Sequence, residues 1–232
     1  MIIEKKGNIF TTKAQTIVNT VNCVGIMGAG IAYEFRLREP KMFEKYVDLC
    51  EKNMIEIGKL WIYKRDDNAG SYENILNFPT KQHWRYPSKE EYLHKGLQKF
   101  VQTYKDRGIT SIAFPMLGAD KGGIHPKKSL SIMKSYLSKC DIDVEIWAFD
   151  PSAEDNLYLS FVEKFTALDE QTIKAESGLR KDLIAKIKEA IDREDINSLS
   201  GLLRIKGVGD KTLQKLFDYI INTPKRQKTL FD

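Results

Sequence analysis

The chain of 232 residues is poor in the residues that build metal sites and disulfide frameworks, since it has only three cysteines and three histidines. Cys23, Cys50 and Cys140 are odd in number and far apart, which fits neither paired disulfides nor a metal knuckle. The histidines show no paired-ligand spacing. We therefore expect reduced thiols and chemistry that needs neither a metal nor another cofactor.

Long hydrophobic runs are also absent. The first residues become charged at Glu4, too early for a signal peptide, and no stretch of about 18 apolar residues follows that could span a bilayer. Hydrophobic residues make up 42% and charged residues 30%, which is typical of a globular protein with a substantial core. The sequence therefore predicts a cytoplasmic protein with no membrane partner.

The net charge is +5, and most of it lies at the carboxyl-terminal end. From Gly201 onward seven lysines and arginines stand against three aspartates, a local excess of 7 − 3 = +4. Such an excess favours a polyanionic partner for the last segment.

The first two-thirds of the chain alternates short β-branched runs with helical patterns, which predicts an α/β layered domain over residues 1–168. A capping box of Ser88 and Glu91 predicts a helix over 88–106, and Pro126 is suited to begin another. Strands are expected at 16–19, 59–63, 75–77, 111–115 and 144–149.

Beyond Leu168 the pattern changes. Residues 169–178 are polar and predict a linker, whereas helical spacing predicts a small all-α module over 179–222. Its helices are expected around residues 183–191, 199–205 and 212–221. A basic tail, 223–232, follows.

The most informative stretch is IVNTVNCVGIMGAGIA, residues 17–32, in which a strand runs into a loop with Gly25, Gly28 and Gly30 and then into a helix. Glycines allow the backbone to approach a ligand, and the free N–H groups of a helix start favour a phosphate. The order G-x-x-G-x-G is the reverse of the dinucleotide fingerprint, and no Walker motif occurs. A tight turn before a helix explains this loop equally well.

A second stretch, FPMLGADKGGI over residues 114–124, has the same strand, loop and helix order. Two such loops at the carboxyl ends of strands would form opposite walls of one crevice, where open α/β sheets bind ligands. We therefore expect a diphosphate to lie between them.

Gly7-Asn8-Ile9, Asn19 and Asn22 with residues 27–32, and the motifs 115–118 and 122–124 together resemble the macrodomain, an ADP-ribose-binding fold. The resemblance covers nearly all of residues 1–160. It implies a three-layer α/β/α mixed sheet. The run NFPTKQHWR, residues 77–85, is similar to the DarG branch, whose members remove ADP-ribose from DNA bases.

The resemblance also implies site roles. Asn22 would hold the distal ribose and Lys81 would reach its anomeric carbon. Two further residues are candidate supporting groups from their positions alone: Asp120 lies inside the second glycine-rich stretch, and His83 is close to Lys81 in sequence. Asp120 is at least as well explained as a turn residue. For Lys81 a solvated surface lysine is the alternative, and its place in the matched motif favours the catalytic role. ADP-ribose would be bound by Asn8 and Ile9 at the adenine, and by Asn19, Gly28, Ala29, Gly30, Ile31, Leu117, Gly118, Ala119, Gly122, Gly123 and Ile124.

A lysine next to the anomeric carbon has two possible functions. It can act as a nucleophile if its pKa falls, or as a charged group that helps the base depart. The resulting prediction is a DNA ADP-ribosyl glycohydrolase, in an antitoxin or repair role. A reader of ADP-ribosylated nucleic acid that does not cleave it, or a hydrolase of protein-linked or small-molecule ADP-ribose derivatives, are the alternatives. The resemblance further implies a cognate ADP-ribosyltransferase toxin as a partner.

Residues 202–213 match the helix-hairpin-helix pattern h-x-G-h-G-x-x-T-h, found in DNA repair proteins. Such a hairpin binds the DNA backbone through exposed amides and lysines without reading bases; a plain glycine turn between helices is the alternative. The expected DNA contacts are Lys206, Gly207, Gly209, Lys211 and Lys215. The last residues, Gln227–Asp232, resemble the peptide with which bacterial proteins bind the sliding clamp, and a frayed terminus is the alternative.

Overall fold

The computed structural model describes residues 1–66, 71–193 and 196–221. They divide into two compact units, residues 1–153 and 154–232, which are described separately. We call them the first and second unit.

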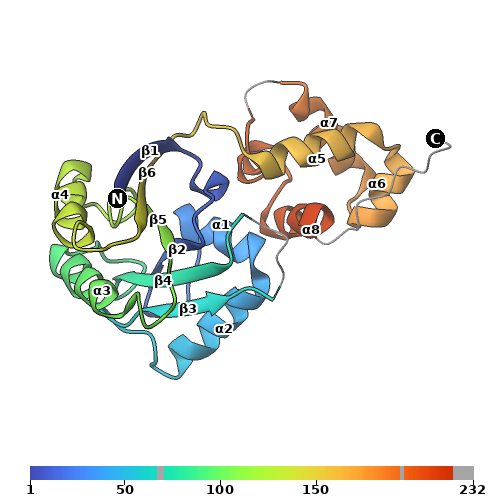
Figure 1. Ribbon diagram of the computed structural model, residues 1–232. Helices are drawn as coiled ribbons and strands as arrows, with labels where there is room; N and C mark the ends of the chain where they lie inside the picture. The colour runs from blue at the N-terminus through green and yellow to red at the C-terminus, as the bar shows by residue number, and fades with distance from the viewer. Residues whose placement is uncertain (67–70, 194–195, 222–232) are drawn as a thin grey trace. The chain divides into compact units, whose positions relative to one another are not determined.

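A six-stranded mixed sheet forms the centre of the first unit (Figure 1). Its order is β1-β6-β5-β2-β4-β3, and only the β3–β4 pair is antiparallel. The strands are β1 (Ile2–Gly7), β2 (Thr16–Asn22), β3 (Trp61–Lys64), β4 (Asn74–Lys81), β5 (Ser111–Pro115) and β6 (Asp143–Phe149). The five expected strands are therefore confirmed, with shifted ends.

Strand β1 was not among the expected strands. Its sequence, IIEKKG, contains three charged residues and no long apolar run. It forms because it lies at the sheet edge and needs only one partner, β6, along which it runs parallel from Ile2 to Gly7.

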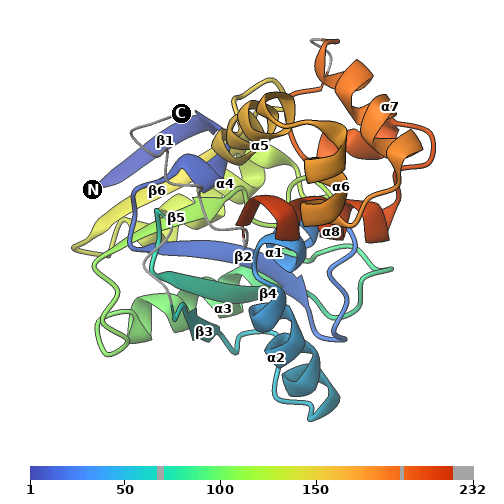
Figure 2. The same ribbon diagram turned by 90° about the vertical axis from the view of Figure 1, so that its right-hand side faces the viewer.

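Helices cover both faces of the sheet (Figures 1 and 2). Helices α1 (Gly30–Arg38) and α2 (Pro40–Glu51) pack on one face, and α3 (Glu90–Thr103) and α4 (Pro126–Leu137) on the other. Alternate residues of β2 point to opposite faces, so Ile17 joins the core under α1 and α2 while Val18 joins the core under α3 and α4. The expected three-layer α/β/α fold is confirmed.

The expected capping box at α3 is wrong. The helix begins at Glu90 after Lys89, whose side chain forms no cap. Ser88 instead turns inward, and its buried hydroxyl has no hydrogen-bond partner. Its backbone N–H donates to the Gly122 carbonyl at 2.9 Å, so Ser88 supports the second glycine-rich stretch rather than the helix.

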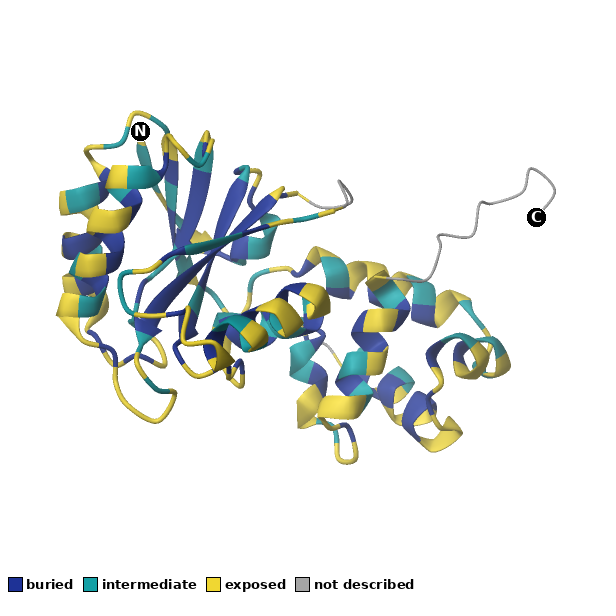
Figure 3. Cartoon of the chain, turned by 90° about the horizontal axis from the view of Figure 1, so that it is seen from below, coloured by how far each residue is buried: buried dark blue, intermediate teal, exposed yellow. Residues whose placement is uncertain are grey.

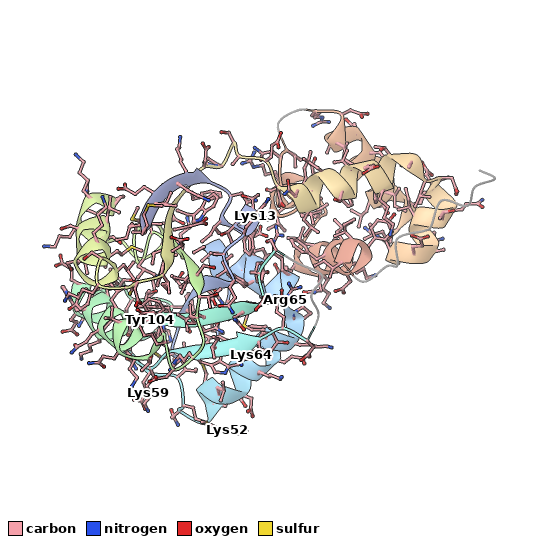
Figure 4. All side chains as sticks on the ribbon, viewed as in Figure 1. Lys13, Lys52, Lys59, Lys64, Arg65 and Tyr104 are labelled. Atoms are coloured by element: carbon pink, nitrogen blue, oxygen red, sulfur yellow. The ribbon has the colours of Figure 1, made fainter. Side chains whose placement is uncertain are left out.

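A nearly buried ion pair ties helices α1 and α2 to the strands. Arg65, labelled in Figure 4, pairs with Glu39 at 2.9 Å, and the Tyr72 hydroxyl donates to the same carboxylate at 3.1 Å. Glu39 lies between α1 and α2 and Arg65 directly follows β3. The charges are compensated at close range, as burial requires.

The second unit is entirely helical among its described residues. It contains α5 (Asn156–Ala167), α6 (Glu170–Ser177), α7 (Lys181–Ile191), the 3-10 helix η2 (Ser200–Arg204) and α8 (Asp210–Ile221). Figure 3 shows buried faces turned toward one another and exposed faces turned outward. The core includes Phe161, Phe165, Ile187, Leu213 and Phe217, each fully buried.

The division between the units falls after Ala153, earlier than the expected boundary at 168. Helix α5 belongs to the second unit because Phe165 packs edge-on against Tyr219 of α8, with ring centroids 6.2 Å apart. The expected linker 169–178 is also different, since most of it forms α6, which Asp169 caps by accepting from two backbone N–H groups. The expected helix over 199–205 is a 3-10 helix.

Among the residues that the structure describes, no helix is long and apolar enough to cross a membrane. The tail 223–232, with the clamp-like peptide Gln227–Asp232, lies outside the described residues.

Candidate active site at the carboxyl edge of the sheet

Two glycine-rich loops leave the same edge of the sheet. The first loop, residues 23–29, follows β2, and the second loop, residues 116–125, follows β5. Because β2 and β5 are parallel neighbours, both loops start at the carboxyl edge. This is the arrangement that the sequence predicted.

The two loops approach each other where the first one enters α1. A Cβ atom built on Gly30 would lie 3.8 Å from Cγ of Lys121 and 3.9 Å from a carboxylate oxygen of Asp120. Asp120 itself is exposed and lies 4.0 Å from the Lys121 ammonium, a weak contact. The geometry therefore places Asp120 beside the opening between the two loops, and among the described residues only the Lys121 ammonium pairs with it.

Lys81 lies at the same edge. It ends β4, where it is the register partner of Asn22 at the end of β2. Its Nζ donates to the Lys121 carbonyl in the second loop at 2.5 Å. The two expected catalytic residues are thus brought together, and Lys81 connects them to the second loop.

The side chain of Asn22 holds the first loop in shape. Its Oδ1 accepts from the N–H of Val24 at 3.0 Å, and its Nδ2 donates to the carbonyl of Ile26 at 2.5 Å. The Tyr46 hydroxyl donates to the Asn22 carbonyl at 2.7 Å. Burial raises the pKa of Tyr46 well above its usual value, so the hydroxyl keeps the proton it donates. Asn22 therefore has a structural role that the sequence reasoning did not foresee.

Cys23 is buried next to Asn22. Burial first, and then the neighbouring Cys50, raise the pKa of its thiol to about 11. The thiol stays protonated at neutral pH, so Cys23 is not an activated nucleophile.

The side chain of Asn19 is buried within β2, three residues before the strand ends at Asn22. It is fully buried and donates to the side chain of Asn77, its register partner on β4, at 2.9 Å. The remaining amide atoms of this pair, Asn19 Oδ1 and Asn77 Nδ2, are buried without a hydrogen-bond partner. Asn19 joins the two strands beneath the site.

The helices that follow the loops begin differently. Helix α1 starts after Ala29, which has no capping side chain, so its first N–H groups point outward beside exposed Gly28 and Gly30. Helix α4 starts with Pro126, and the His125 ring accepts from the Lys127 N–H at 3.3 Å. Only the start of α1 therefore has the uncapped donors that suit an anion.

The second loop is tightly folded on itself. The N–H of Ile124 donates to the Gly118 carbonyl at 2.9 Å. A Cβ on Gly122 would come within 2.3 Å of that same carbonyl oxygen and 2.6 Å of Ser88 Oγ, so no side chain fits there. Leu117 is buried, and its carbonyl accepts from Ser129 at 2.6 Å. Within the same loop, Ala119 is half-buried and Gly123 is exposed.

The predicted adenine contacts lie at the end of β1. Asn8 caps the 3-10 helix η1 (Ile9–Thr11) by accepting from the Phe10 N–H at 3.1 Å, and Ile9 is buried. Sequence reasoning missed Phe149, which ends β6 opposite Gly7 and is 75% exposed. In the sequence, only its position as the last apolar residue of the expected strand 144–149 pointed to it, because its exposure is visible in the structure alone.

The second expected support residue, His83, lies in the turn after β4. Its Nδ1 accepts from the backbone N–H of Arg85 at 3.2 Å, and its ring stacks on Trp84. The structure therefore gives His83 a role in shaping this turn.

A scan against family models matches residues 18–133, half of the chain, to the Macro domain. The chain belongs to the macrodomain family. The macrodomain, which lies in the first unit, is 37% identical over 146 residues to a DNA ADP-ribosyl glycohydrolase of Thermus aquaticus, covering 63% of this chain and 40% of that protein. The chain thus spans less than half the length of this curated relative.

Solved structures agree. The macrodomain of Mycobacterium tuberculosis DarG is 36% identical, with a TM-score of 0.61, and the match covers 63% of this chain and 97% of that one. DarTG of Thermosipho africanus, in complex with ADP-ribose, is 33% identical with a TM-score of 0.59, over 64% of this chain and 41% of that one.

The predicted hairpin joins η2 to α8 in the second unit. Gly207 has a φ of +100°, a conformation that favours glycine, and Lys206, Gly209 and Lys211 are exposed. Neither lysine forms an ion pair with a described residue. Lys215 is different, because its ammonium donates to the Gly178 carbonyl at the end of α6, at 2.8 Å. Lys186 of α7, which the sequence did not single out, approaches the hairpin, since a Cβ on Gly207 would lie 4.0 Å from its Nζ.

Proposed function

We propose that the macrodomain binds ADP-ribose across the carboxyl edge of its sheet. The diphosphate would lie between the two loops, with the uncapped start of α1 on one side and the folded second loop on the other. Two features support this proposal. The loops meet at Gly30 and Lys121, and of the two helices that follow them, α1 lacks a side-chain cap and begins at this meeting point. Phe149 would stack on the adenine beside Asn8 and Ile9.

We further propose that the protein is a DNA ADP-ribosyl glycohydrolase. The observation that carries this proposal is the pairing of Lys81 with Asn22 at the strand ends, with the Lys81 ammonium bonded to the second loop. The names of the relatives point to the same activity. Asp120 at the opening between the two loops would assist.

The proposed reaction breaks the bond between C1″ of the distal ribose and a nitrogen of the modified base. Water supplies the oxygen that bonds to C1″, and the base leaves with a proton. Lys81 would either stabilise the charge on the departing base or attack C1″ first and be released by water. Asn22 would act through the shape of the first loop and its bond network.

Replacement of Lys81 tests this proposal. We expect Lys81→Ala to lower release of ADP-ribose from a modified single-stranded oligonucleotide by about 100-fold or more, while binding of free ADP-ribose changes little. Lys81→Arg keeps the charge but not the amine, so partial activity would indicate electrostatic aid and none would indicate a nucleophile. Trapping of a reduced lysine adduct with cyanoborohydride would identify the nucleophile directly.

The same assay distinguishes the alternatives. Tight binding of the modified oligonucleotide without turnover by the native protein would make it a reader. Faster turnover of ADP-ribosylated protein, or of a small ADP-ribose derivative, than of the oligonucleotide would assign another substrate to the same pocket.

We propose that the second unit holds the DNA backbone. The exposed Lys206 and Lys211 beside the Gly207 hairpin support this, and Lys186 would add a third contact, whereas Lys215 is engaged at the end of α6. We expect Lys206→Ala with Lys211→Ala to weaken binding of any DNA sequence and to reduce the salt slope by about two. Lys174→Ala on α6 is the matched control, and an equal loss there would argue against the hairpin.

Two protein partners complete the proposal, for a protein acting in the cytoplasm. The first is an ADP-ribosyltransferase toxin, supported by the relation to DarTG, and the second is the sliding clamp, through Gln227–Phe231. Co-purification with each partner tests the two proposals separately. Removal of residues 227–232 should abolish co-purification with the clamp and leave co-purification with the toxin unchanged.

A further inference from the structure

The turn after β4 carries an exposed aromatic and cationic surface. We call residues 83–86 the aromatic turn. The His83 and Trp84 rings are stacked, with centroids 5.6 Å apart and planes at 25°, and Tyr86 lies 5.5 Å from His83. The Arg85 guanidinium lies 4.8 Å from the centroid of Trp84. Trp84 and Tyr86 are 47% and 65% exposed, so part of each ring is accessible to a ligand.

The aromatic turn is fixed to both loops of the crevice. Directly before the turn the Cys23 N–H donates to the Gln82 carbonyl at 3.3 Å, and two residues after it the Ser88 N–H donates to the Gly122 carbonyl at 2.9 Å. Within the turn, the Tyr86 N–H donates to the His83 carbonyl at 3.1 Å. A surface held in this way would lose little freedom when a ligand binds.

The surroundings suit a nucleic acid. Residues 81–89 contain Lys81, Arg85 and Lys89 and no acidic residue. Val24 and Ile26 of the adjoining first loop are also exposed, although most large apolar side chains of this chain are buried. Flat π faces beside fixed cations bind an unstacked base together with its phosphate.

We propose that the aromatic turn binds a nucleotide next to the modified one, by stacking its base on Trp84 and Tyr86 and pairing its phosphate with Arg85. This inference rests on the proposed glycohydrolase function and adds to it a subsite for the neighbouring nucleotide. A base can stack there only when it has left the double helix, so the subsite favours single-stranded over duplex substrate.

The test compares the full-length native protein with Trp84→Leu, Tyr86→Leu and the aromatic control Trp84→Phe. Leucine keeps apolar bulk but removes the π face. Each protein is given two substrates, an ADP-ribosylated single-stranded pentanucleotide and the same ADP-ribosylated nucleoside without neighbours. Release of ADP-ribose is followed over a range of substrate concentrations, and binding of free ADP-ribose is measured by calorimetry.

For Trp84→Leu we expect the KM for the pentanucleotide to rise about 5- to 150-fold, the range for loss of one stacked base. The kcat, the turnover of the nucleoside and the affinity for ADP-ribose should stay as in the native protein. For Trp84→Phe, which keeps an aromatic ring, the KM for the pentanucleotide should stay close to the native value.

An unchanged KM for the pentanucleotide in both leucine variants would overturn the inference, while the glycohydrolase proposal would stand. Equal losses on the nucleoside and the pentanucleotide would also overturn it, since they would place Trp84 in the ADP-ribose site. If the native protein releases ADP-ribose from neither substrate, the proposed function fails instead.

Discussion

The two glycine-rich loops share the same order of strand, loop and helix in the sequence, but their structures differ. Each follows a buried parallel strand and precedes a helix. The first loop is shaped by a side chain, Asn22, and ends at a helix without a side-chain cap. The second loop is shaped by backbone contacts around Gly122, and its helix is capped by His125. The difference suggests that the first loop supplies donors for an anion and the second supplies a rigid wall.

Of the variants that test this difference between the loops, Gly122→Ala should have the largest effect on stability and binding. Its Cβ would collide with the Gly118 carbonyl, so the backbone of the second loop must move. We expect the free energy of unfolding to fall by about 3 kcal/mol, and ADP-ribose binding to be lost. Gly28→Ala in the first loop is the matched control, because its Cβ would have only an ordinary contact, 3.7 Å from Ile26. Chemical denaturation compares the two, and equal stabilities would disprove the rigid wall.

Ala29→Asp tests the first loop with a change that should raise stability and weaken ADP-ribose binding. Ala29 has the extended backbone of a capping residue, so aspartate there should cap α1 and stabilise the protein by about 0.5 to 1 kcal/mol. The same carboxylate would occupy the N–H groups and repel the diphosphate, so we expect about tenfold weaker ADP-ribose binding in calorimetry.

His125→Ala removes the side-chain cap of α4, whereas Ala29→Asp adds one to α1. It should lower stability by about 1 kcal/mol without changing the affinity. If Ala29→Asp binds ADP-ribose as tightly as the native protein, the start of α1 does not contact the phosphates.

Tyr46→Phe removes one hydroxyl beneath the first loop. The buried Asn22 carbonyl then loses its donor, and we expect a loss of about 1 kcal/mol in unfolding free energy. Amide exchange should become faster at Val24 and Ile26 and stay unchanged in the second loop. Faster exchange in both loops would show that they are not shaped independently.

Acid should destabilise the sheet at Glu145 of β6, and this is the smallest of the expected effects. Burial alone would raise the pKa of Glu145, but hydrogen bonds from Lys5, Thr12 and Trp147 outweigh it and hold that pKa below its ordinary value of 4.5. A lowered pKa means that the stabilisation is complete above pH 4.5 and is lost as the pH falls through the folded-state pKa. Unfolding measured between pH 6 and pH 3 should show this loss in the native protein and a smaller one in Glu145→Gln.

The sequence predicted the layered fold and the two loops because both depend on local patterns. Apolar runs predicted the strands, and glycines before helices marked the loops. It did not predict β1, whose charged residues hide a strand that needs only one neighbour, or the inward turn of Ser88, which a tertiary contact with Gly122 decides.

The candidate site was likewise predicted only in part. The pairing of Lys81 with Asn22 followed from the motif that resembles macrodomains, but the roles of the side chains did not. Asn22 is bonded within its own loop, Asn19 lies below the site, and Phe149 was missed. The bonds of Asn19 to Asn77 and of Tyr46 to Asn22 join residues far apart in sequence, and residue patterns do not encode them.

The most direct test of the account follows backbone amides by NMR while ADP-ribose is added to the full-length protein. We predict that the amides of Gly28, Gly30 and Ile31 in and after the first loop, and of Gly118 and Gly123 in the second, shift together with one dissociation constant. Ribose 5-phosphate, which lacks the diphosphate, should shift them far less. Shifts confined to one loop, or none in either, would contradict the claim that the two loops bind the diphosphate between them.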